Sequence, residues 1–447
     1  MRLSGWGRYP VVDCQTAAPS DEAALGALVR GAHLGRQAKG GGLIARGNGR
    51  AYGDSAVNRA LTVSMRRFNR MLGFDPETGL LTVEAGVILG DVVRAFLPRG
   101  WFVPVTPGTK FVTVGGMIAA DVHGKNHHAA GSFGAHLSWL DVMDADGRVH
   151  RVRPGEALFE ATVGGMGLSG IILRAAFRLI RVESAWIRQR TVPAANLAEV
   201  MAAFDAHADW TYSVAWIDCL ARGPALGRSL LLLGEHARLS DLDPPRAQDP
   251  YRIPAKRAKR IPLDAPSWAL NRYSVRAFNE LYYWKGCRAA GETLIDWDSY
   301  FYPLDAILDW NRIYGRRGFV QFQCVLPRDR SEAGLTALLE AIGAAGQGSF
   351  LAVLKLFGAQ ESLISFPREG FTLALDFPAT PRALALVDQL HRIAIDHDGG
   401  FYLAKDARLT AGDFAASEPR LAAFRAARGA AGTSHRFASA QSERLAL

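Results

Sequence analysis

The sequence has few cysteines. Cys14, Cys219, Cys287 and Cys324 are the four in 447 residues, and they lie far apart. There is no Cys-x-x-Cys pair and no cysteine–histidine spacing that suits zinc, so we expect buried, reduced thiols and no bound metal. No run of about 18 uncharged apolar residues is present, which excludes a membrane-spanning helix. The first ten residues lack the apolar run of a signal peptide, which favours a cytoplasmic location.

Acidic residues are fewer than basic ones, with 43 Asp and Glu against 52 Lys and Arg and a net charge of +9. This balance favours anionic partners such as phosphates, nucleic acids or acidic membrane surfaces. Because no nucleic-acid-binding motif of recognised spacing occurs, we expect no nucleic acid partner. The hydrophobic content of 49% is typical of a folded protein, and the length predicts two domains.

Glycine is concentrated in two N-terminal segments. The segment 107–128 starts with a Pro-Gly turn, passes through Gly115 and Gly116, and ends in the polar residues His123, Lys125, Asn126, His127 and His128. The segment 44–55 places three glycines among arginines. Glycine lets a backbone approach a ligand closely, and its exposed N–H groups can bind phosphate. Together the two segments predict a phosphate-bearing cofactor beside a reaction centre, although either alone would also suit a basic surface turn.

Residues 165–170 fit the G-x-G-x-x-G pattern, but residues 171–182 after them read as a strand. A dinucleotide fingerprint should open a helix, so we reject a Rossmann fold. Other patterns predict a helix over 23–38, a strand over 80–85 followed by a short helix at 89–97, and a hairpin over 137–152.

The middle of the chain differs in composition. Tryptophans occur at Trp186, Trp210, Trp216, Trp268, Trp284, Trp297 and Trp310. Most are expected in a core, and a second domain that handles a bulky substrate would also contain them. Residues 239–266 are rich in proline and contain Arg252, Lys256, Arg257, Lys259 and Arg260. We expect a mobile, solvated loop there, with attraction to an anionic membrane as the alternative.

Four segments carry a resemblance to a known family. Residues 45–54 (ARGNGRAYGD), 123–134 (HGKNHHAAGSFG), 161–172 (ATVGGMGLSGII) and 402–406 (YLAKD) closely resemble those of the decaprenylphosphoryl-β-D-ribose 2′-oxidases. These proteins belong to the vanillyl-alcohol-oxidase type of FAD-binding superfamily. The glycine segment is shared by the wider superfamily, whereas HGKNHH and YLAKD are specific. The resemblance covers nearly the whole chain.

The resemblance implies an α+β, two-domain flavoprotein like vanillyl-alcohol oxidase. Its FAD-binding domain would be discontinuous, comprising residues 1–183 and 400–447, and residues 184–399 would form a substrate-binding domain with an antiparallel sheet. The implied reaction is FAD-dependent oxidation of the ribose 2′-hydroxyl of a polyprenylphosphoryl-β-D-ribose to the 2′-keto intermediate. This is the first half of epimerisation to the arabinose donor for cell-wall polysaccharide, and a short-chain NADH-dependent ketoreductase is the implied partner. The implied location is cytoplasmic or peripheral at the inner membrane, with the periplasmic face left open.

The resemblance also assigns site residues. The active-site lysine is Lys405. The FAD-binding residues are Ala45, Arg46, Gly47, Asn48, Gly49, Arg50, Ala51, Tyr52, Gly53, Asp54, Ser55, Gly108, Thr113, Val114, Gly115, Gly116, Ala120, Asp121, Val122, His123, Ile172 and Tyr402. The substrate-binding residues are Lys125, Trp216, Arg312, Gln321, Gln323 and Lys355, with Tyr52 contributing as well.

Four positions depart from relatives of the resembled family. Arg50 stands roughly where covalently flavinylated relatives have histidine, which implies non-covalent FAD. Ala374 replaces a cysteine of mycobacterial members, so the chemistry does not need a thiol there. Thr372 replaces an asparagine and Phe301 a tyrosine, and these changes leave the lipid tail and sugar open.

The residues suit alcohol oxidation independently of the family. A base must take the hydroxyl proton, and burial can lower the pKa of Lys405 enough for that role. The other interpretation pairs Lys405 with Asp406 or Asp398. Gln321 and Gln323 alternate along a strand, so both side chains face one side. Competing functions are an FAD-dependent oxidase of soluble sugars, alditols or aldonolactones, and a non-enzymatic anion- or membrane-binding protein.

Overall fold

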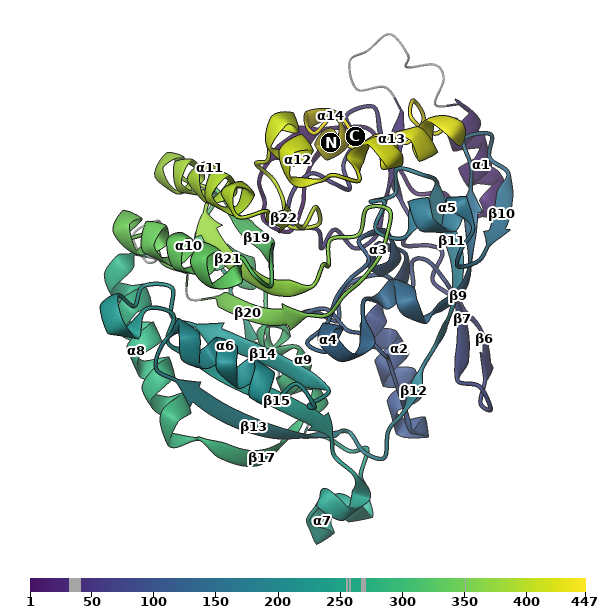
Figure 1. Ribbon diagram of the computed structural model, residues 1–447. Coiled ribbons are helices and arrows are strands. Elements are labelled where there is room, and N and C mark those ends of the chain that lie inside the picture. Colours follow the sequence, from purple (N-terminus) through teal and green to yellow (C-terminus); the bar gives the residue numbers. More distant parts are fainter. Residues whose placement is uncertain (32–41, 255, 257–258, 267–270, 350) are drawn as a thin grey trace.

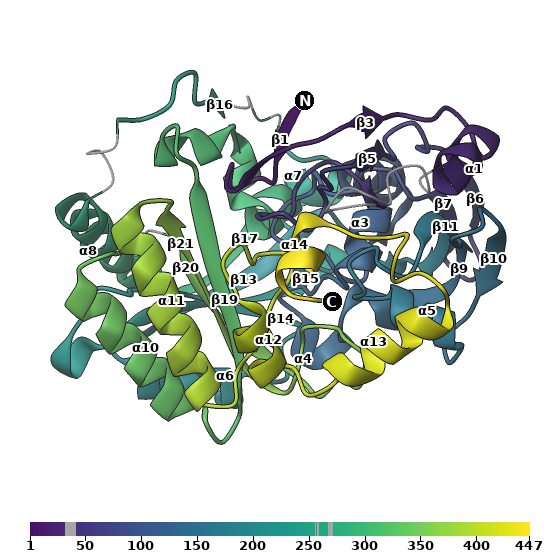
Figure 2. The same ribbon diagram turned by 90° about the horizontal axis from the view of Figure 1, so that it is seen from above.

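The computed structural model describes residues 1–31, 42–254, 256, 259–266, 271–349 and 351–447. It contains mixed helices and sheets, and its largest sheet is antiparallel throughout. The α+β class expected from the sequence is therefore confirmed. Figures 1 and 2 show the N-terminal third and the C-terminal helices on one side of the molecule and the large sheet on the other.

The N-terminal third contains a five-stranded sheet and a three-stranded sheet. The first has the order β10 (Val149–Val152), β9 (Leu137–Met143), β11 (Ile171–Arg178), β7 (Leu80–Glu84) and β6 (Met71–Asp75). The second is parallel, with β5 (Leu61–Ser64) between β3 (Thr16–Ala17) and β4 (Leu43–Arg46). Helices α1 (Glu22–Gly31), α2 (Leu89–Phe96), α3 (Val114–Ala119), α4 (His127–Ala130) and α5 (Ala157–Thr162) accompany them. Short pairs join β1 (Arg2–Ser4) to β2 (Val11–Asp13), and β8 (Trp101–Phe102) to β12 (Ile180–Arg181).

Several local predictions are confirmed here. The 137–152 segment is an antiparallel hairpin of β9 and β10, and β7 and α2 lie where the sequence places them. The strand expected after the rejected glycine motif is β11. The helix expected over 23–38 is α1 as far as Gly31, and residues 32–38 lie outside the described residues.

The large sheet has eight strands. Their order is β17 (Gly291–Asp296), β13 (Trp186–Ala194), β15 (Ser229–His236), β14 (Tyr212–Ile217), β20 (Ala352–Phe357), β21 (Gly370–Pro378), β19 (Phe319–Pro327) and β22 (Gly400–Phe401). Helices α6 (Leu197–Ala206), α10 (Ser331–Ala345) and α11 (Pro381–Asp396) pack along it, as does α8 (Arg272–Arg288). The shorter elements in this part are α7 (Pro244–Gln248), β16 (Lys259–Arg260), α9 (Trp297–Phe301) and β18 (Ile307–Leu308).

Alternation along the strands gives the sheet two different faces. Leu231, Phe322 and Leu373 belong to the main hydrophobic core with α6, α10 and α11. Their neighbours in sequence point the other way, and α8 lies on that opposite face, where Gly286 is close to the side chain of Leu230. Figure 2 shows α8 on the side of the sheet opposite to α6, α10 and α11. One face is therefore closed by helices, while part of the other is left to line a cavity.

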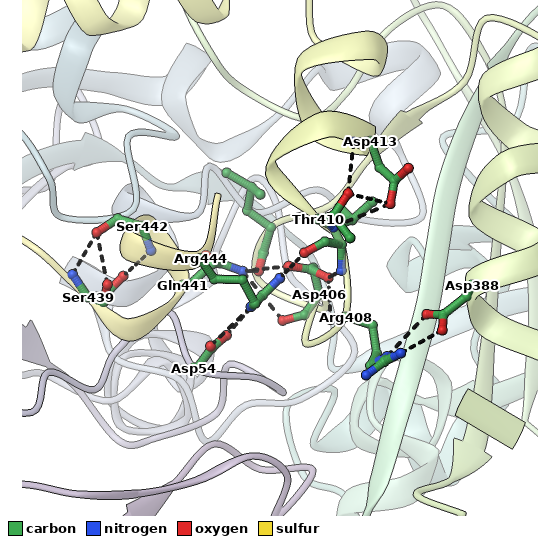
Figure 3. A network of polar contacts seen from close by, with 12 residues as sticks. Asp54, Asp388, Asp406, Arg408, Thr410, Asp413, Ser439, Gln441, Ser442 and Arg444 are labelled. Carbon is green, nitrogen blue, oxygen red and sulfur yellow. Dashed lines mark hydrogen bonds and ion pairs between the residues drawn. The ribbon is translucent and has the colours of Figure 1, made fainter. Parts of the chain in front are cut away.

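The C-terminal segment returns to the glycine segment through α12 (Ala411–Ser417), α13 (Leu421–Ala430) and α14 (Ala440–Arg444). Arg444 lies between Asp54 and Asp406 and forms ion pairs with both, at 2.7 and 2.9 Å (Figure 3). Asp406 also accepts hydrogen bonds from the backbone N–H groups of Arg408 and Leu409. A buried carboxylate needs such partners to stay charged, so this network fixes the 402–409 turn against the N-terminal loop.

Two expectations need correction. Cys287 is exposed, whereas the other three cysteines are buried as expected. The proline-rich stretch is partly ordered: Pro244–Gln248 is helical, Lys256 bonds to Asp296, and Arg260 lies 3.3 Å from Asp309. Lys256 and Arg260 are thus each held by a carboxylate. Arg257 lies outside the described residues.

The tryptophans divide as follows. Trp186, Trp210, Trp216, Trp297 and Trp310 are buried, as expected for most of them. Trp284 is exposed on α8, and Trp268 lies outside the described residues. No helix in the described ranges is long and apolar enough to span a membrane.

Candidate functional site

A cavity of about 410 Å³ lies between the two glycine segments and the open face of the large sheet. Residues from both glycine segments line one side of it. Strands β14, β19, β20 and β21 supply Val214, Trp216, Gln321, Gln323, Val353, Lys355, Thr372 and Ala374 from the other side. The turn containing Tyr402, Ala404 and Lys405 closes the cavity between them. The segments that the sequence singled out separately therefore meet around one space.

The glycines of the two segments have different local roles. A Cβ on Gly47 would lie 2.1 Å from the Thr113 hydroxyl, and one on Gly115 would lie 2.8 Å from the Cβ of Ala85. These two glycines allow the segments to pack closely. Gly108 has nothing within 4 Å of its missing Cβ, and Gly116 has one neighbour, the Thr113 hydroxyl at 3.1 Å. Both line the cavity, so their open side faces the space where a ligand would lie.

Buried polar atoms at the cavity wall lack partners within the described part of the chain. They are Arg50 Nε, Ser55 Oγ and His123 Nδ1. Buried polar groups are nearly always hydrogen-bonded, so unsatisfied donors that converge on a cavity indicate a polar ligand. Arg50 also packs its guanidinium 4.0 Å from the ring centre of Trp6. A cationic, glycine-lined wall of this kind fits a diphosphate and its attached groups.

Lys405 is held in the cavity by the glycine segment. Its ammonium nitrogen lies 3.6 Å from the centre of the Tyr52 ring, and the Tyr52 N–H donates to the carbonyl of Ala404 at 2.8 Å. Burial lowers the pKa of Lys405, with the nearby charge of Lys355 adding to the effect. The paired alternatives do not apply, because Asp406 binds Arg444 and Asp398 lies 3.5 Å from Arg330.

Asp376 is a buried carboxylate that sequence reasoning missed. It lies on β21, accepts a hydrogen bond from the side-chain amide of Gln321, and is electrostatically linked to Lys405. Burial raises the pKa of Asp376, so the carboxyl group and the lysine amine are poised to share a proton. The pairing of Asp376 with Gln321 across β19 and β21 depends on strand register, which local sequence patterns do not reveal.

Gln321 and Gln323 face the cavity together, as their alternation on β19 predicts. The amide nitrogen of Gln323 lies 3.2 Å from the Thr372 hydroxyl and 3.2 Å from His123 Nε2. Ala374, Phe301 and Arg50 line the cavity as well, so all four of the positions that depart from relatives are cavity residues.

Two further lysines give the cavity a positive charge. Burial lowers the pKa of Lys125 to about 7 and that of Lys355 to about 8. Lys125 donates to the carbonyl of Tyr300 and lies 3.9 Å from that residue's ring centre. Mutual repulsion between the lysines contributes to the lower pKa of Lys125, so an anion bound among them would be stabilised.

The histidines of the HGKNHH run have separate partners. His123 lies among the rings of Phe357, Phe366 and Tyr402. His127 Nε2 lies 2.9 Å from the Gln360 amide, and His128 Nε2 lies 2.8 Å from the Trp210 carbonyl. Across the described residues, no group of three or more His, Cys, Asp or Glu side chains could hold a metal ion.

Six of the expected site residues lie outside the cavity lining. They are Arg46, Gly53, Asp54, Val114, Asp121 and Arg312. Each of them packs against, or forms hydrogen bonds with, other residues of the protein. Arg312 donates to the carbonyl of Pro262 at 2.6 Å, and Asp121 accepts from Ser132 and Gly134. Gly53 leaves no room for a Cβ, which would lie 2.0 Å from the Asp406 carbonyl oxygen.

The cavity also contains residues that the sequence did not single out. Among them are Trp6, Thr106, Val112, Tyr282, Leu304 and Asp305. Gly167 and Gly170 of the rejected motif line it too, with positive φ values of 79° and 158°. The glycines of this motif therefore lie at the cavity wall, although the motif precedes a strand rather than a helix.

Comparison with known proteins identifies an FAD-binding domain and relatives of the whole chain. Residues 15–153 match the family model described as an FAD binding domain. The whole chain aligns with decaprenylphosphoryl-β-D-ribose oxidase of Mycolicibacterium smegmatis, at 37% identity and over 97% of that protein. An uncharacterized protein encoded in the mprA 5′ region of Streptomyces coelicolor is 34% identical over 81% of this chain and 100% of its own length.

A solved structure shares the fold. The D396N variant of BBE-like 1 from Physcomitrella patens superposes with a TM-score of 0.63, covering 95% of this chain and 89% of its own. Its sequence identity is 14%, so the likeness concerns the fold alone.

Proposed function

The chain belongs to the decaprenylphosphoryl-β-D-ribose oxidase family, and on that premise we propose how its cavity carries out the reaction. It is an FAD-dependent oxidoreductase that acts on a CH–OH group. Its substrate is a polyprenylphosphoryl-β-D-ribose, whose 2′-hydroxyl is oxidised to a ketone. The observation that carries the assignment of the reaction centre is the position of Lys405, half-buried in the cavity where the glycine segment meets the polar face of the sheet.

The residues present fit FAD. We assign the diphosphate to the glycine loop 47–55 and to Ser55 and Arg50, whose buried donors otherwise lack partners. The open sides of Gly108 and Gly116 would admit the cofactor, and Tyr402 would contact it from the C-terminal turn. When bound, FAD supplies the acceptor for the hydride that leaves the carbinol carbon.

We assign Lys405 as the group that accepts the proton of the reacting hydroxyl. A neutral amine can accept that proton, and burial makes the neutral form accessible near pH 7. Asp376 then acts as the neighbouring site through which the proton leaves, since its carboxyl group is linked electrostatically to the lysine. Tyr52 keeps the ammonium group oriented through its ring face.

The remaining cavity residues suit the two ends of the substrate. The side-chain amides of Gln321 and Gln323 can bind sugar hydroxyls, which both donate and accept. Lys125 and Lys355 suit the phosphodiester anion, and Trp216 offers an apolar wall for the first isoprenyl units.

The lysine pair predicts a pH dependence of substrate capture. Below about pH 7 both side chains are protonated and attract the phosphodiester, and as the pH rises through about 7 and 8 they lose that charge in turn. We expect the affinity of the protein for the substrate's phosphodiester to fall by about tenfold between pH 6.5 and 9, because a hydrogen bond to a charged group contributes about 1.5 kcal/mol or more. Binding titrations with a 2-deoxyribose analogue, which lacks the reacting hydroxyl, measure this fall separately from Lys405, whose loss of a proton near pH 7 favours the chemical step over the same range. The Lys125→Met, Lys355→Met double variant should bind the analogue weakly with a flatter pH profile, and an unchanged alkaline loss of affinity in that variant would contradict the assignment.

Several wider features are part of the proposal. We divide the chain into an FAD-binding domain of residues 1–183 and 400–447 and a substrate-binding domain of residues 184–399. A short-chain NADH-dependent ketoreductase would complete the epimerisation by reducing the ketone from the other face. We place the protein in the cytoplasm or at the inner membrane as a peripheral protein.

The test is an anaerobic reduction experiment. The purified protein should be yellow, and a short-chain polyprenylphosphoryl-β-D-ribose should bleach its flavin absorbance while the sugar loses two hydrogens by mass spectrometry. The 2-deoxyribose analogue, which lacks the reacting hydroxyl, should leave the flavin oxidised. Bleaching by free sugars or alditols with rapid peroxide release in air would instead favour a soluble-sugar oxidase, and a colourless protein would favour a non-enzymatic anion-binding protein.

A further inference from the structure

Helix α8 has apolar side chains on both of its sides. Val275 and Asn279 are buried against the sheet, and Gly286 contacts Leu230. The opposite side carries Tyr273, Leu281 and Trp284, which are 68%, 51% and 49% exposed. These three positions fall at helical spacing and form one stripe. A helix packed on a sheet normally turns polar residues outward, so a stripe of large apolar side chains facing solvent indicates a surface that binds something.

The charges on α8 indicate the chemistry of what binds. The helix carries Arg272, Arg276, Lys285 and Arg288, and its carboxylate Glu280 is paired with Arg228 at 2.8 Å. The guanidinium of Arg288 lies 3.6 Å from the ring centre of Trp284. Aromatic side chains bordered by cations are the composition of helices that lie in the headgroup region of an anionic bilayer.

The position of α8 connects this surface with the cavity. Tyr282 of the same helix lines the cavity, and its ring lies 4.8 Å from that of Trp216 on β14. Figures 1 and 2 show α8 at the edge of the molecule, away from the C-terminal helices. One side of the helix therefore borders the cavity while the other faces outward.

We infer that the outward face of α8, defined by Tyr273, Leu281, Trp284 and the four cations, docks on the surface of an anionic lipid bilayer. The inference rests on the proposed function, because a substrate with a polyprenyl tail resides in the bilayer and its sugar must be reached from the membrane surface. Docking through α8 places the cavity wall formed by Tyr282 and Trp216 next to that surface.

A second copy of the chain is a weaker candidate for this face. In a twofold symmetric dimer the α8 face would meet itself, and its excess of arginine and lysine would repel the same residues of the partner. An anionic lipid surface has the complementary charge and needs no matching shape.

Vesicle flotation tests the inference. The FAD-loaded protein should float with vesicles of 30% phosphatidylglycerol in phosphatidylcholine and should stay in solution with phosphatidylcholine alone. The Leu281→Ser, Trp284→Ser double variant should lose at least tenfold in partitioning to the anionic vesicles, whereas Leu72→Ser, at an exposed apolar residue of β6, should partition like the unmodified protein. Equal flotation of the double variant and the unmodified protein would overturn the inference.

Two further measurements separate the possible causes of failure. Flavin bleaching by a short-chain substrate in vesicle-free solution should be the same in the double variant and the unmodified protein, because neither substituted side chain lines the cavity. If no protein bleaches while vesicle binding follows the pattern above, the proposed substrate is wrong and the docking surface stands. If size-exclusion chromatography shows that the double substitution dissociates an oligomer while vesicle binding is unchanged, the face is a protein interface and the inference fails.

Discussion

Lys405→Met is expected to retain bound FAD and to lose substrate oxidation, with the rate of flavin bleaching falling by about 10²- to 10⁴-fold, the usual contribution of a general base. Methionine keeps the length of the side chain and its contact with the Tyr52 ring, but it cannot take a proton. Lys405 lies against the Tyr52 ring of the glycine segment, and the other two lysines of the cavity, Lys125 and Lys355, are assigned to the phosphodiester. Rapid-mixing absorbance measurements with saturating substrate isolate the chemical step.

A matched control separates proton transfer from general loss of positive charge. Lys355→Met removes a neighbouring half-buried ammonium from the same cavity, and it should raise KM with a smaller change in the bleaching rate at saturation. Asp376→Asn should shift the pH profile of the bleaching rate, because the carboxyl group that interacts electrostatically with Lys405 is removed. Near-normal bleaching by Lys405→Met at saturation would remove the lysine from the chemistry.

The sequence predicted the local elements of the ligand wall well because their signals are local. Gly115 and Gly116, expected at a ligand wall, both line the cavity. The short helix α3 that contains them begins after Thr113, whose hydroxyl accepts from the Gly116 N–H at 3.2 Å, and this helix was not predicted from sequence. Gln321 and Gln323 share a face because alternation along a strand is fixed by backbone geometry. Such features do not depend on the rest of the fold.

Features that depend on strand register or on contacts between distant segments could not be predicted from local sequence patterns. Asp376 reaches Gln321 only through the pairing of β19 with β21, whose strands are separated by α10 and β20. Arg312 was assigned to the substrate by family resemblance, yet its side chain bonds to the carbonyls of Ile261 and Pro262. The exposed stripe on α8 could not be predicted either. The helix has apolar residues on both sides, so its sequence does not show which side packs on the sheet.

The second large effect concerns cofactor binding. Gly116→Val should yield a folded protein that contains almost no flavin. The neighbourhood of Gly116 leaves room for a Cβ apart from the Thr113 hydroxyl at 3.1 Å, and its φ is not in the left-handed region, so the fold can accept valine. The open side faces the cavity, where the branched side chain would occupy the approach to the cofactor.

The measurement compares flavin content with the stability of the apoprotein. Gly116→Val should have an unfolding temperature close to that of the flavin-free unmodified protein, and added FAD should raise only the latter, since a ligand stabilises the folded state that binds it. Gly115→Val is the matched contrast: its Cβ would lie 2.8 Å from Ala85, so it should lower the stability of the apoprotein itself. A yellow Gly116→Val protein with a full flavin complement would show that the backbone at Gly116 does not face the cofactor, and the orientation assigned to FAD in this cavity would then have to be reversed.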